Sequence, residues 1–181
     1  MSESIEAGPA QHRLFFALWP DDALRQQIER NTCQAIKEAG GRRIPAGNFH
    51  VTLVFIGEVP EQQVAGVIAA ACEVRAQPFA LTLDMLESWT GADVLVYSGE
   101  QAPPALGALV DRLRISLLRH QFKLQRQTFK PHITLVRRLP RRLPKRPLAA
   151  LQWPVSDFAL VESRGGPDGS IYTVIGRWPL A

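Results

Sequence analysis

Two four-residue segments of this sequence share one pattern: histidine, an aliphatic residue, threonine and leucine. They are residues 50–53 (His-Val-Thr-Leu) and residues 132–135 (His-Ile-Thr-Leu). The pKa of an imidazole lies near neutrality, so two of them can supply a general base and a general acid together. A protein that brought both segments to one cleft would have the groups needed to hydrolyse a phosphodiester without a metal ion.

Both segments lie in stretches typical of β-strands, over residues 49–56 and 129–136. Successive side chains of a strand point to opposite faces, so the histidine and the threonine of each segment share one face. The aliphatic residue and the leucine share the other face. We therefore expect His50 and Thr52 to line one cleft together with His132 and Thr134.

A single strand histidine is usually a polar-face residue with a local hydrogen bond, but a duplicate in a matching context favours catalysis. Zinc takes three or four Cys, His or carboxylate ligands, and no third ligand with suitable spacing accompanies the two histidines. We expect no metal and no cofactor. The sequence has no Gly-x-Ser-x-Gly elbow, and the glycine-rich residues 165–169 match neither a Walker loop nor a dinucleotide fingerprint.

The hydrophobic patterns predict neighbouring strands as well as strands separated by helices, which favours an α+β fold with largely antiparallel sheets. A helix followed by a histidine-motif strand occurs twice, over 21–53 and 104–135, so we expect two similar lobes. Residues 1–12 are expected to form a disordered N-terminal tail that includes His12, and residues 13–181 a single bilobal domain. The expected elements are strands at 13–19, 79–86, 94–97, 155–162 and 171–176 and helices starting near 21, 61 and 104.

Six of the basic residues lie between Arg137 and Arg146, directly after the second motif, and without them the net charge of +4 would be negative. Such a segment attracts nucleic-acid phosphates, but a solvated loop is an equally good interpretation. Cys33 and Cys72 lack metal-ligand spacing and are expected to be small core residues. The polar N-terminus lacks the features of a secretory signal, and no apolar run is long enough to span a membrane, so we expect a cytoplasmic monomer.

Aromatic residues offer a second kind of candidate. The four tryptophans, Trp19, Trp89, Trp153 and Trp178, are interpreted as core or lobe-junction residues rather than as platforms for bases. Phe129 immediately precedes the second motif. It is a candidate for stacking on a base, and core packing is an equal alternative.

The two motifs and their flanks closely resemble the 2H phosphoesterase superfamily, and within it the RNA 2′,3′-cyclic phosphodiesterases, also called 2′-5′ RNA ligases. The likeness runs from about residue 13 to residue 180. It includes the segments 13–18, 48–59, 78–79, 129–135 and 162–163. One His-x-Thr segment is weak evidence for such a relationship, whereas two with these flanks are strong.

The resemblance implies a bilobal fold with pseudo-twofold symmetry, helices outside and a central active-site groove. It implies hydrolysis of RNA 2′,3′-cyclic phosphate ends, or of cyclic nucleotides, to 2′-phosphomonoesters. His50 would be the proton donor to the departing oxygen and His132 the base that activates water, although symmetry leaves these two labels exchangeable. Thr52 and Thr134 would hydrogen-bond the phosphate, and Arg137 would offset the charge of the transition state.

The same resemblance implies that ligation, the reverse reaction, would use the same two histidines. Three questions stay open at this point. The chain could be a non-catalytic RNA-binding module, or a related esterase acting on small cyclic phosphates or on 2′-5′ linkages. The basic segment 137–147 also leaves open whether long RNA is preferred to small cyclic nucleotides.

Overall fold

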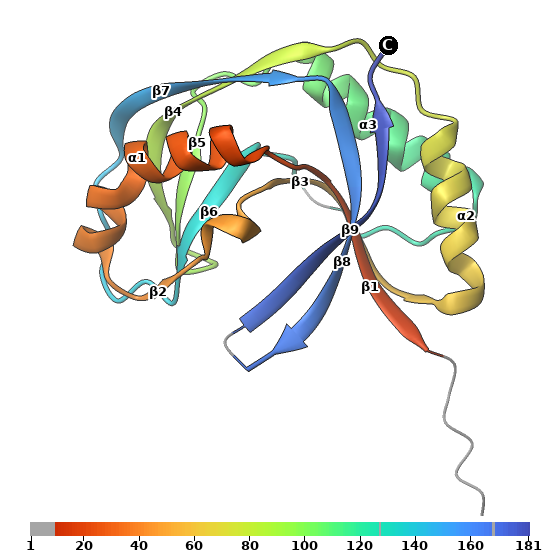
Figure 1. Ribbon diagram of the computed structural model, residues 1–181, viewed down its shortest axis with the longest axis horizontal. Coiled ribbons are helices and arrows are strands. Elements are labelled where there is room, and N and C mark those ends of the chain that lie inside the picture. The colour runs from red at the N-terminus through yellow and green to blue at the C-terminus, as the bar shows by residue number, and fades with distance from the viewer. Residues whose placement is uncertain (1–9, 127, 168) are drawn as a thin grey trace, which may run out of the picture.

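The structure, a computed structural model, describes residues 10–126, 128–167 and 169–181. Within these residues, three helices and nine strands follow one another in an α+β order, as the sequence predicted (Figure 1). The elements are β1 (Gln11–Leu18), α1 (Asp22–Ala39), β2 (Arg42–Arg43), the short 3-10 turn η1 (Ala46–Asn48), β3 (Val51–Pro60), α2 (Glu61–Cys72), β4 (Phe79–Trp89), β5 (Val94–Ser98), α3 (Pro104–Arg119), β6 (His132–Arg137), β7 (Arg146–Val155), β8 (Asp157–Gly166) and β9 (Gly169–Pro179).

All the strands belong to one antiparallel sheet in the order β7-β4-β5-β6-β3-β1-β8-β9, with β2 added beside β6. Long ladders hold each half together, whereas β3 and β6 pair only at Val51 and Ile133. The two halves therefore meet at a narrow junction and diverge on either side of it. That junction joins the two histidine-motif strands.

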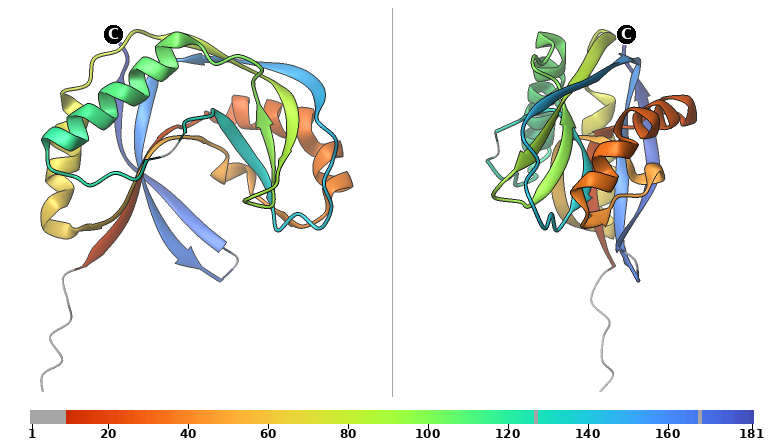
Figure 2. Two further views of the ribbon diagram at one scale, coloured as in Figure 1. Left: turned by 180° about the vertical axis from the view of Figure 1, so that it is seen from behind. Right: turned by 90° about the vertical axis from the view of Figure 1, so that its left-hand side faces the viewer.

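The helices are exchanged between the two halves of the sheet (Figures 1 and 2). Helix α1 follows β1 in the sequence but packs against β5, β6 and β7 of the other half. Helix α3 follows β5 but packs against β3, beside α2. The units β1-α1-β3 and β5-α3-β6 therefore have the same order of elements, and the helix of each packs against the other half. This arrangement agrees with the expected pair of lobes.

Local signals set both ends of α1. The Asp21 carboxylate accepts a hydrogen bond from the Leu24 backbone N–H at 2.8 Å, which caps the first turn. The helix stops at Gly40 and Gly41, whose φ angles of 65° and 76° suit glycine. A Cβ atom at Gly41 would lie 2.8 Å from the Arg138 carbonyl oxygen, so the close approach to the end of β6 also requires glycine.

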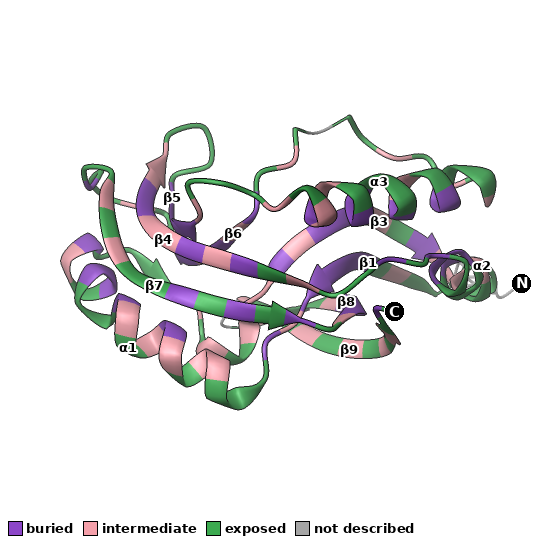
Figure 3. Cartoon of the chain, turned by 90° about the horizontal axis from the view of Figure 1, so that it is seen from above, coloured by how far each residue is buried: buried purple, intermediate pink, exposed green. Residues whose placement is uncertain are grey.

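Strand β7 was not predicted, because Pro147 and Pro154 and the adjacent basic residues obscured its pattern. It lies at the edge of the sheet, where proline is tolerated because one side of the strand needs no ladder hydrogen bonds. Buried residues alternate with exposed ones toward its C-terminal end (Figure 3). The expected basic loop over 137–147 is correspondingly shorter, because Arg146 already belongs to β7.

Strand β1 begins at Gln11, so the expected tail over 1–12 is wrong for its last two residues, and its first nine lie outside the described residues. His12 is held by two carboxylates: its Nδ1 lies 2.6 Å from Glu162 Oε1, and its Nε2 bonds Glu61. These contacts raise the pKa of His12 and tie the start of β1 to β8 and α2.

The two cysteines differ from expectation as well. Both Cys33 and Cys72 are exposed, because each lies on the outer side of its helix rather than on the buried stripe. None of the helices in the described part of the chain has the length and hydrophobicity that a membrane crossing requires.

Candidate active site

The junction between β3 and β6 brings the two histidine motifs together. An antiparallel pair centred on Val51 and Ile133 sets His50 opposite Thr134 and Thr52 opposite His132. The side chains of Val51 and Ile133 are fully buried, and those of Leu53 and Leu135 are buried on the same face. The four polar side chains therefore share the other face of the sheet, and each half contributes one imidazole and one hydroxyl.

The same backbone contact orients both imidazoles. His50 Nδ1 lies 2.7 Å from the Asn48 carbonyl oxygen, and His132 Nδ1 lies 2.8 Å from the Lys130 carbonyl oxygen. A carbonyl oxygen only accepts, so Nδ1 carries the proton in both rings and donates it. Nε2 is then the atom of each ring that is available to exchange a proton. For His50 this atom lies 3.1 Å from Thr52 Oγ1.

Three aromatic rings enclose His50. Trp19 stacks on the imidazole with the ring centroids 5.6 Å apart and 20° between the planes. Phe15 lies 5.0 Å away, and Tyr172 meets the ring edge-on at 5.2 Å. Burial by these rings disfavours the charged form, and the nearby His132 and Arg137 act in the same direction. Together they lower the pKa of His50 to about 4.

A single aromatic ring and a charged network support His132. The indole of Trp89 lies 4.3 Å from the imidazole, centroid to centroid. The ammonium of Lys130 lies over the same indole, 5.0 Å from the ring centroid. Burial lowers the pKa of His132, and the positive charges of Arg137 and Lys130 add to that effect.

Glu87 connects the elements that surround His132. Its Oε2 accepts hydrogen bonds from the Trp89 indole at 2.9 Å and from Lys130 Nζ at 2.6 Å, and Lys145 lies 3.1 Å from Oε1. Burial alone would raise the pKa of this carboxyl, but its three donors outweigh burial and lower the pKa to about 2. The charged carboxylate of Glu87 therefore holds the Trp89 indole against His132. It also holds Lys130, whose backbone carbonyl oxygen orients the His132 imidazole.

Three cavities contain residues of the two motifs in their walls. One of about 520 Å³ lies on the His132 side and contains Thr52, Trp89 and Phe129 in its walls. A second, of about 320 Å³, lies on the His50 side and contains Thr134 and Tyr172. A third, of about 440 Å³, shares Thr52 with the first and His50 with the second. Space for a substrate thus extends to both sides of the motif pair.

The remaining candidates also lie at these cavities. Arg137, at the end of β6, is exposed and lines the two cavities that contain His50. Phe129 is half-buried: it lines the His132-side cavity and packs against the core. The structure therefore brings His50, Thr52, Phe129, His132, Thr134 and Arg137 to one groove.

Part of the basic segment after the second motif is held by contacts within the protein. Arg146 pairs with Glu38 at 2.5 Å, and Arg141 donates to the Glu38 carbonyl near the end of α1. Lys145 pairs with Glu87. Carboxylates therefore neutralise two of the six basic residues of this segment, and both interpretations of the segment stand.

The sequence also matches a known protein family. Residues 20–167 match the model of the 2′-5′ RNA ligase superfamily, which covers most of the chain. The chain belongs to this superfamily. Its relatives include an RNA 2′,3′-cyclic phosphodiesterase of Escherichia coli, 31% identical over 170 residues that cover 93% of this chain and 96% of the relative. Another, from Thermus thermophilus, is 30% identical and covers 93% of this chain and 90% of the relative.

Solved structures of superfamily members agree with this fold. Escherichia coli LigT complexed with 3′-AMP superposes with a TM-score of 0.86 at 30% identity, covering 94% of this chain and 99% of LigT. LigT complexed with phosphate superposes with a TM-score of 0.80, again at 30% identity, covering 94% of this chain and 98% of LigT. The bilobal α+β fold expected from the resemblance is confirmed.

Sequence reasoning missed the residues that surround the two imidazoles. Trp19 and Trp89 were interpreted as core or junction residues, yet each lies against one of the histidines. Phe15, Tyr172 and Glu87 were not singled out. The sequence did place Phe15, Trp19 and Tyr172 within expected strands. Only the pairing of β1 with β8 and of β8 with β9 brings these three rings to His50.

Proposed function

We propose that this protein hydrolyses RNA 2′,3′-cyclic phosphodiester ends to 2′-phosphomonoesters by acid-base catalysis with two histidines. The observation that carries the proposal is the antiparallel pairing of the two motifs. Both imidazoles are anchored through Nδ1, which leaves Nε2 of each ring as the nitrogen that exchanges a proton. The names of the relatives, RNA 2′,3′-cyclic phosphodiesterase, support this substrate.

In the proposed reaction, a water oxygen attacks phosphorus while the bond from phosphorus to the 3′-oxygen breaks. His132 Nε2 accepts the proton of the water, and His50 Nε2 donates a proton to the departing 3′-oxygen. The phosphate stays attached to the 2′-oxygen. Exchange with solvent then returns His50 to its protonated form and His132 to its neutral form.

Hydrogen bonds and positive charge would stabilise the phosphorane-like transition state. Thr52 and Thr134 lie beside the two imidazoles, so their hydroxyls are placed to donate to the phosphate oxygens. Arg137 lines the cavities on the His50 side, where its guanidinium would offset the added negative charge. Phe129 would provide an apolar wall for a base on the His132 side.

The low pKa values of the two imidazoles suit an anionic substrate. Both rings are neutral near pH 7 in the free protein, so neither repels the other. A bound phosphate brings a negative charge, which raises the pKa of an adjacent imidazole and lets one ring hold the proton that it must donate. Substrate binding would thus create the acid-base pair.

We also propose a cytoplasmic, monomeric enzyme in which residues 13–181 act as one bilobal unit, needing no metal and no cofactor. RNA ends and small cyclic nucleotides are its proposed substrates. The composition of the chain and the sheet that joins both motifs support this proposal.

The deciding assay is incubation of the purified protein, in excess EDTA, with an RNA that carries a 2′,3′-cyclic terminus. We expect a 2′-phosphomonoester product, identified by chromatography against 2′- and 3′-phosphate standards. Binding of the RNA without turnover would replace this proposal by that of a binding module. A 3′-phosphate product would show that the 2′-oxygen leaves, which contradicts the proposed direction of cleavage.

A further inference from the structure

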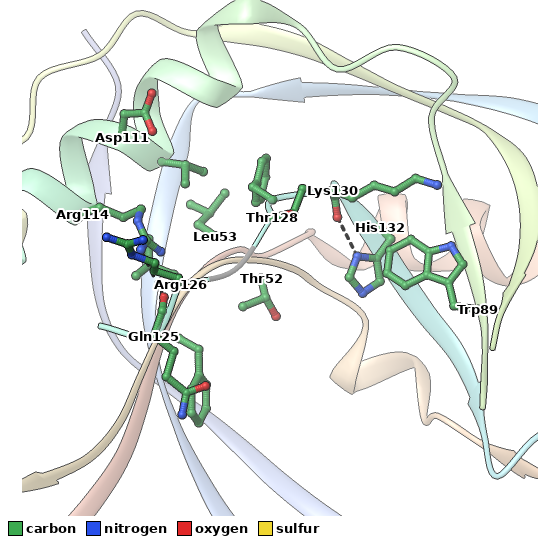
Figure 4. A pocket seen from close by; sticks show the side chains of 14 residues that line it. Thr52, Leu53, Trp89, Asp111, Arg114, Gln125, Arg126, Thr128, Lys130 and His132 are labelled. Carbon is green, nitrogen blue, oxygen red and sulfur yellow. Dashed lines mark hydrogen bonds between the residues drawn. The ribbon is translucent and has the colours of Figure 1, made fainter. Parts of the chain in front are cut away.

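A cation, an indole and an imidazole lie one against another at the His132 end of the groove. The Lys130 ammonium lies over the Trp89 indole, and that indole lies against His132. Figure 4 shows the three side chains together, with the bond between His132 and the Lys130 carbonyl oxygen dashed. The ring that supports this imidazole is thus itself held by a positive charge.

The same order of groups occurs at His50. Trp19 stacks on the His50 imidazole. The guanidinium carbon of Arg25 lies over the Trp19 indole, 5.6 Å from the ring centroid. A guanidinium at this distance is attracted by the negative face of the indole. Arg25 therefore contacts the ring that covers His50, as Lys130 contacts the ring that covers His132.

Repetition of the motifs does not explain this likeness, because the groups come from positions that do not correspond. Trp19 follows β1 and Arg25 lies in α1, both within the unit β1-α1-β3. Trp89 ends β4, which lies outside the unit β5-α3-β6, and Lys130 lies in the segment before β6. Each half of the protein thus arrives at the order cation, indole, imidazole with different elements.

The surroundings of Arg25 within its own helix do not favour a cation. Arg25 lies in the first turn of α1, where the helix dipole disfavours positive charge. Its side chain is 17% exposed, and its buried Nε has no hydrogen-bond partner among the described residues. Its ion pair, at 2.8 Å, is with Asp22, whose side chain is 92% exposed, and such pairs add little stability. The contact with the indole gains most from the burial, because a cation binds an aromatic face more strongly away from water.

The Trp19 indole lacks the hydrogen bond that fixes Trp89. The Trp89 N–H donates to Glu87 at 2.9 Å. Within residues 10–126, 128–167 and 169–181, the Trp19 N–H has no such partner, and its side chain is only half-buried. Tyr172 meets the indole edge-on, with the ring centroids 6.4 Å apart. Arg25 lies over the face of the ring and is therefore placed to limit its movement.

We propose that Arg25 is a positioning residue for proton donation: it holds the Trp19 indole against His50, and the indole keeps Nε2 of His50 directed at the departing 3′-oxygen. This inference rests on the proposed function, which assigns that proton to His50. Arg25 lines none of the three cavities that contain the motif residues, so it acts through Trp19 and not on the substrate. Orientation of a proton donor affects kcat more than KM.

Four substitutions test this role. Arg25→Met removes the charge but keeps an unbranched side chain that suits a helix. Arg25→Lys restores a cation, which can lie over the indole as Lys130 lies over Trp89. Trp19→Leu, alone and combined with Arg25→Met, shows whether Arg25 acts through the indole. Arg30→Met is the matched control, because Arg30 is an exposed arginine of the same helix.

Two measurements are made on each variant. NMR titration of the His50 imidazole reports the surroundings of the ring without any substrate, and the dispersion of the same spectra shows that the variant is folded. Hydrolysis of a 2′,3′-cyclic mononucleotide gives kcat and KM. Both constants are taken at the pH of maximal kcat, so that a change in protonation does not enter the comparison.

We expect Arg25→Met to raise the pKa of His50 from about 4 toward 6.5, because a less firmly held indole admits water to the imidazole. Its kcat should fall by about threefold, with KM unchanged within about twofold. Arg25→Lys should recover most of both changes, and Arg30→Met should match the unaltered protein. Adding Arg25→Met to Trp19→Leu should change neither measurement further.

An unchanged His50 titration or an unchanged kcat in Arg25→Met would overturn the inference. So would equal effects of Arg30→Met, or effects of Arg25→Met and Trp19→Leu that multiply in the double variant. Failure of the proposed function is a separate result. The unaltered protein would then not hydrolyse the cyclic mononucleotide, whereas the titration would still report whether Arg25 and Trp19 control the surroundings of His50.

Discussion

The two histidines have the same backbone anchor but different surroundings. His50 lies among Phe15, Trp19 and Tyr172, which remove it from water without adding a charge. His132 lies against Trp89, which is held in turn by a buried carboxylate and a lysine. The two motifs therefore share the backbone contact that sets the tautomer but differ in the groups around each ring. The two imidazoles are therefore oriented in the same way by the backbone, but different neighbours act on the pKa of each ring.

The largest expected effect comes from removing either ring. His50→Ala and His132→Ala should each lower kcat on a cyclic phosphate by about 10²–10⁴-fold, the usual contribution of one general acid or base. His120→Ala is the matched control, because His120 pairs with Glu73 at the end of α3, outside the groove. Circular dichroism should show that all three variants are folded. Loss of activity in only one groove variant would mean that the halves are not functionally paired.

The pH dependence should be the next largest effect. Both imidazoles have a pKa below 6.5 in the free protein, so the form with one proton on the pair declines as pH rises above that value. We expect kcat/KM to fall by about tenfold per pH unit on this alkaline limb. The profile of kcat should lie at higher pH, because bound phosphate raises the pKa of the proton-donating ring. A kcat/KM profile that stays flat up to pH 8 would contradict the low pKa values.

A smaller effect is expected from changing Glu87, which supports the surroundings of His132 but not those of His50. Glu87→Gln removes the charge that binds Lys130 and Lys145 while nearly keeping the shape of the side chain. We expect kcat to fall about tenfold with little change in KM, because Trp89 and the Lys130 carbonyl then hold His132 less firmly. The alkaline limb of the pH profile should shift as well.

Glu38→Gln is the control for this change. It breaks a comparable ion pair, with Arg146, at a carboxylate that lines none of the three groove cavities. A purely structural role of Glu87 would lower the melting temperature in both variants but leave the pH profile unchanged in both.

The smallest expected change in rate comes from opening the aromatic enclosure of His50. Trp19→Leu admits water to the ring, so the pKa of His50 should rise from about 4 toward 6.5, measurable by NMR titration of the imidazole. The folded pKa of His50 lies below the unfolded value, so in the unaltered protein this group costs stability as pH falls from 6.5 toward 4. The variant should lose less stability over that window. An unchanged His50 titration would show that Trp19 is not what desolvates the ring.

The sequence predicted much of the architecture because local patterns mark it. Hydrophobic patterns predicted helices starting near residues 21, 61 and 104, and alternation predicted the faces of the motif strands. Strand β7 was missed because its prolines are compatible with a strand only at a sheet edge, and edge position depends on the whole sheet. Trp19 and Trp89 were interpreted as core or lobe-junction residues, because hydrophobicity alone does not say which ring an indole will face.

The sequence by itself determined that two equal sets of imidazole and hydroxyl groups exist, since strand alternation puts His and Thr on one face wherever each strand lies. Only the tertiary structure decided that the sets face each other, because a single pair, Val51 with Ile133, fixes the register between segments far apart in the chain. The protonation behaviour of each ring was decided at the same level. Burial and neighbouring charge depend on residues from β1, β4 and β9, which come near the histidines only when the sheet is formed.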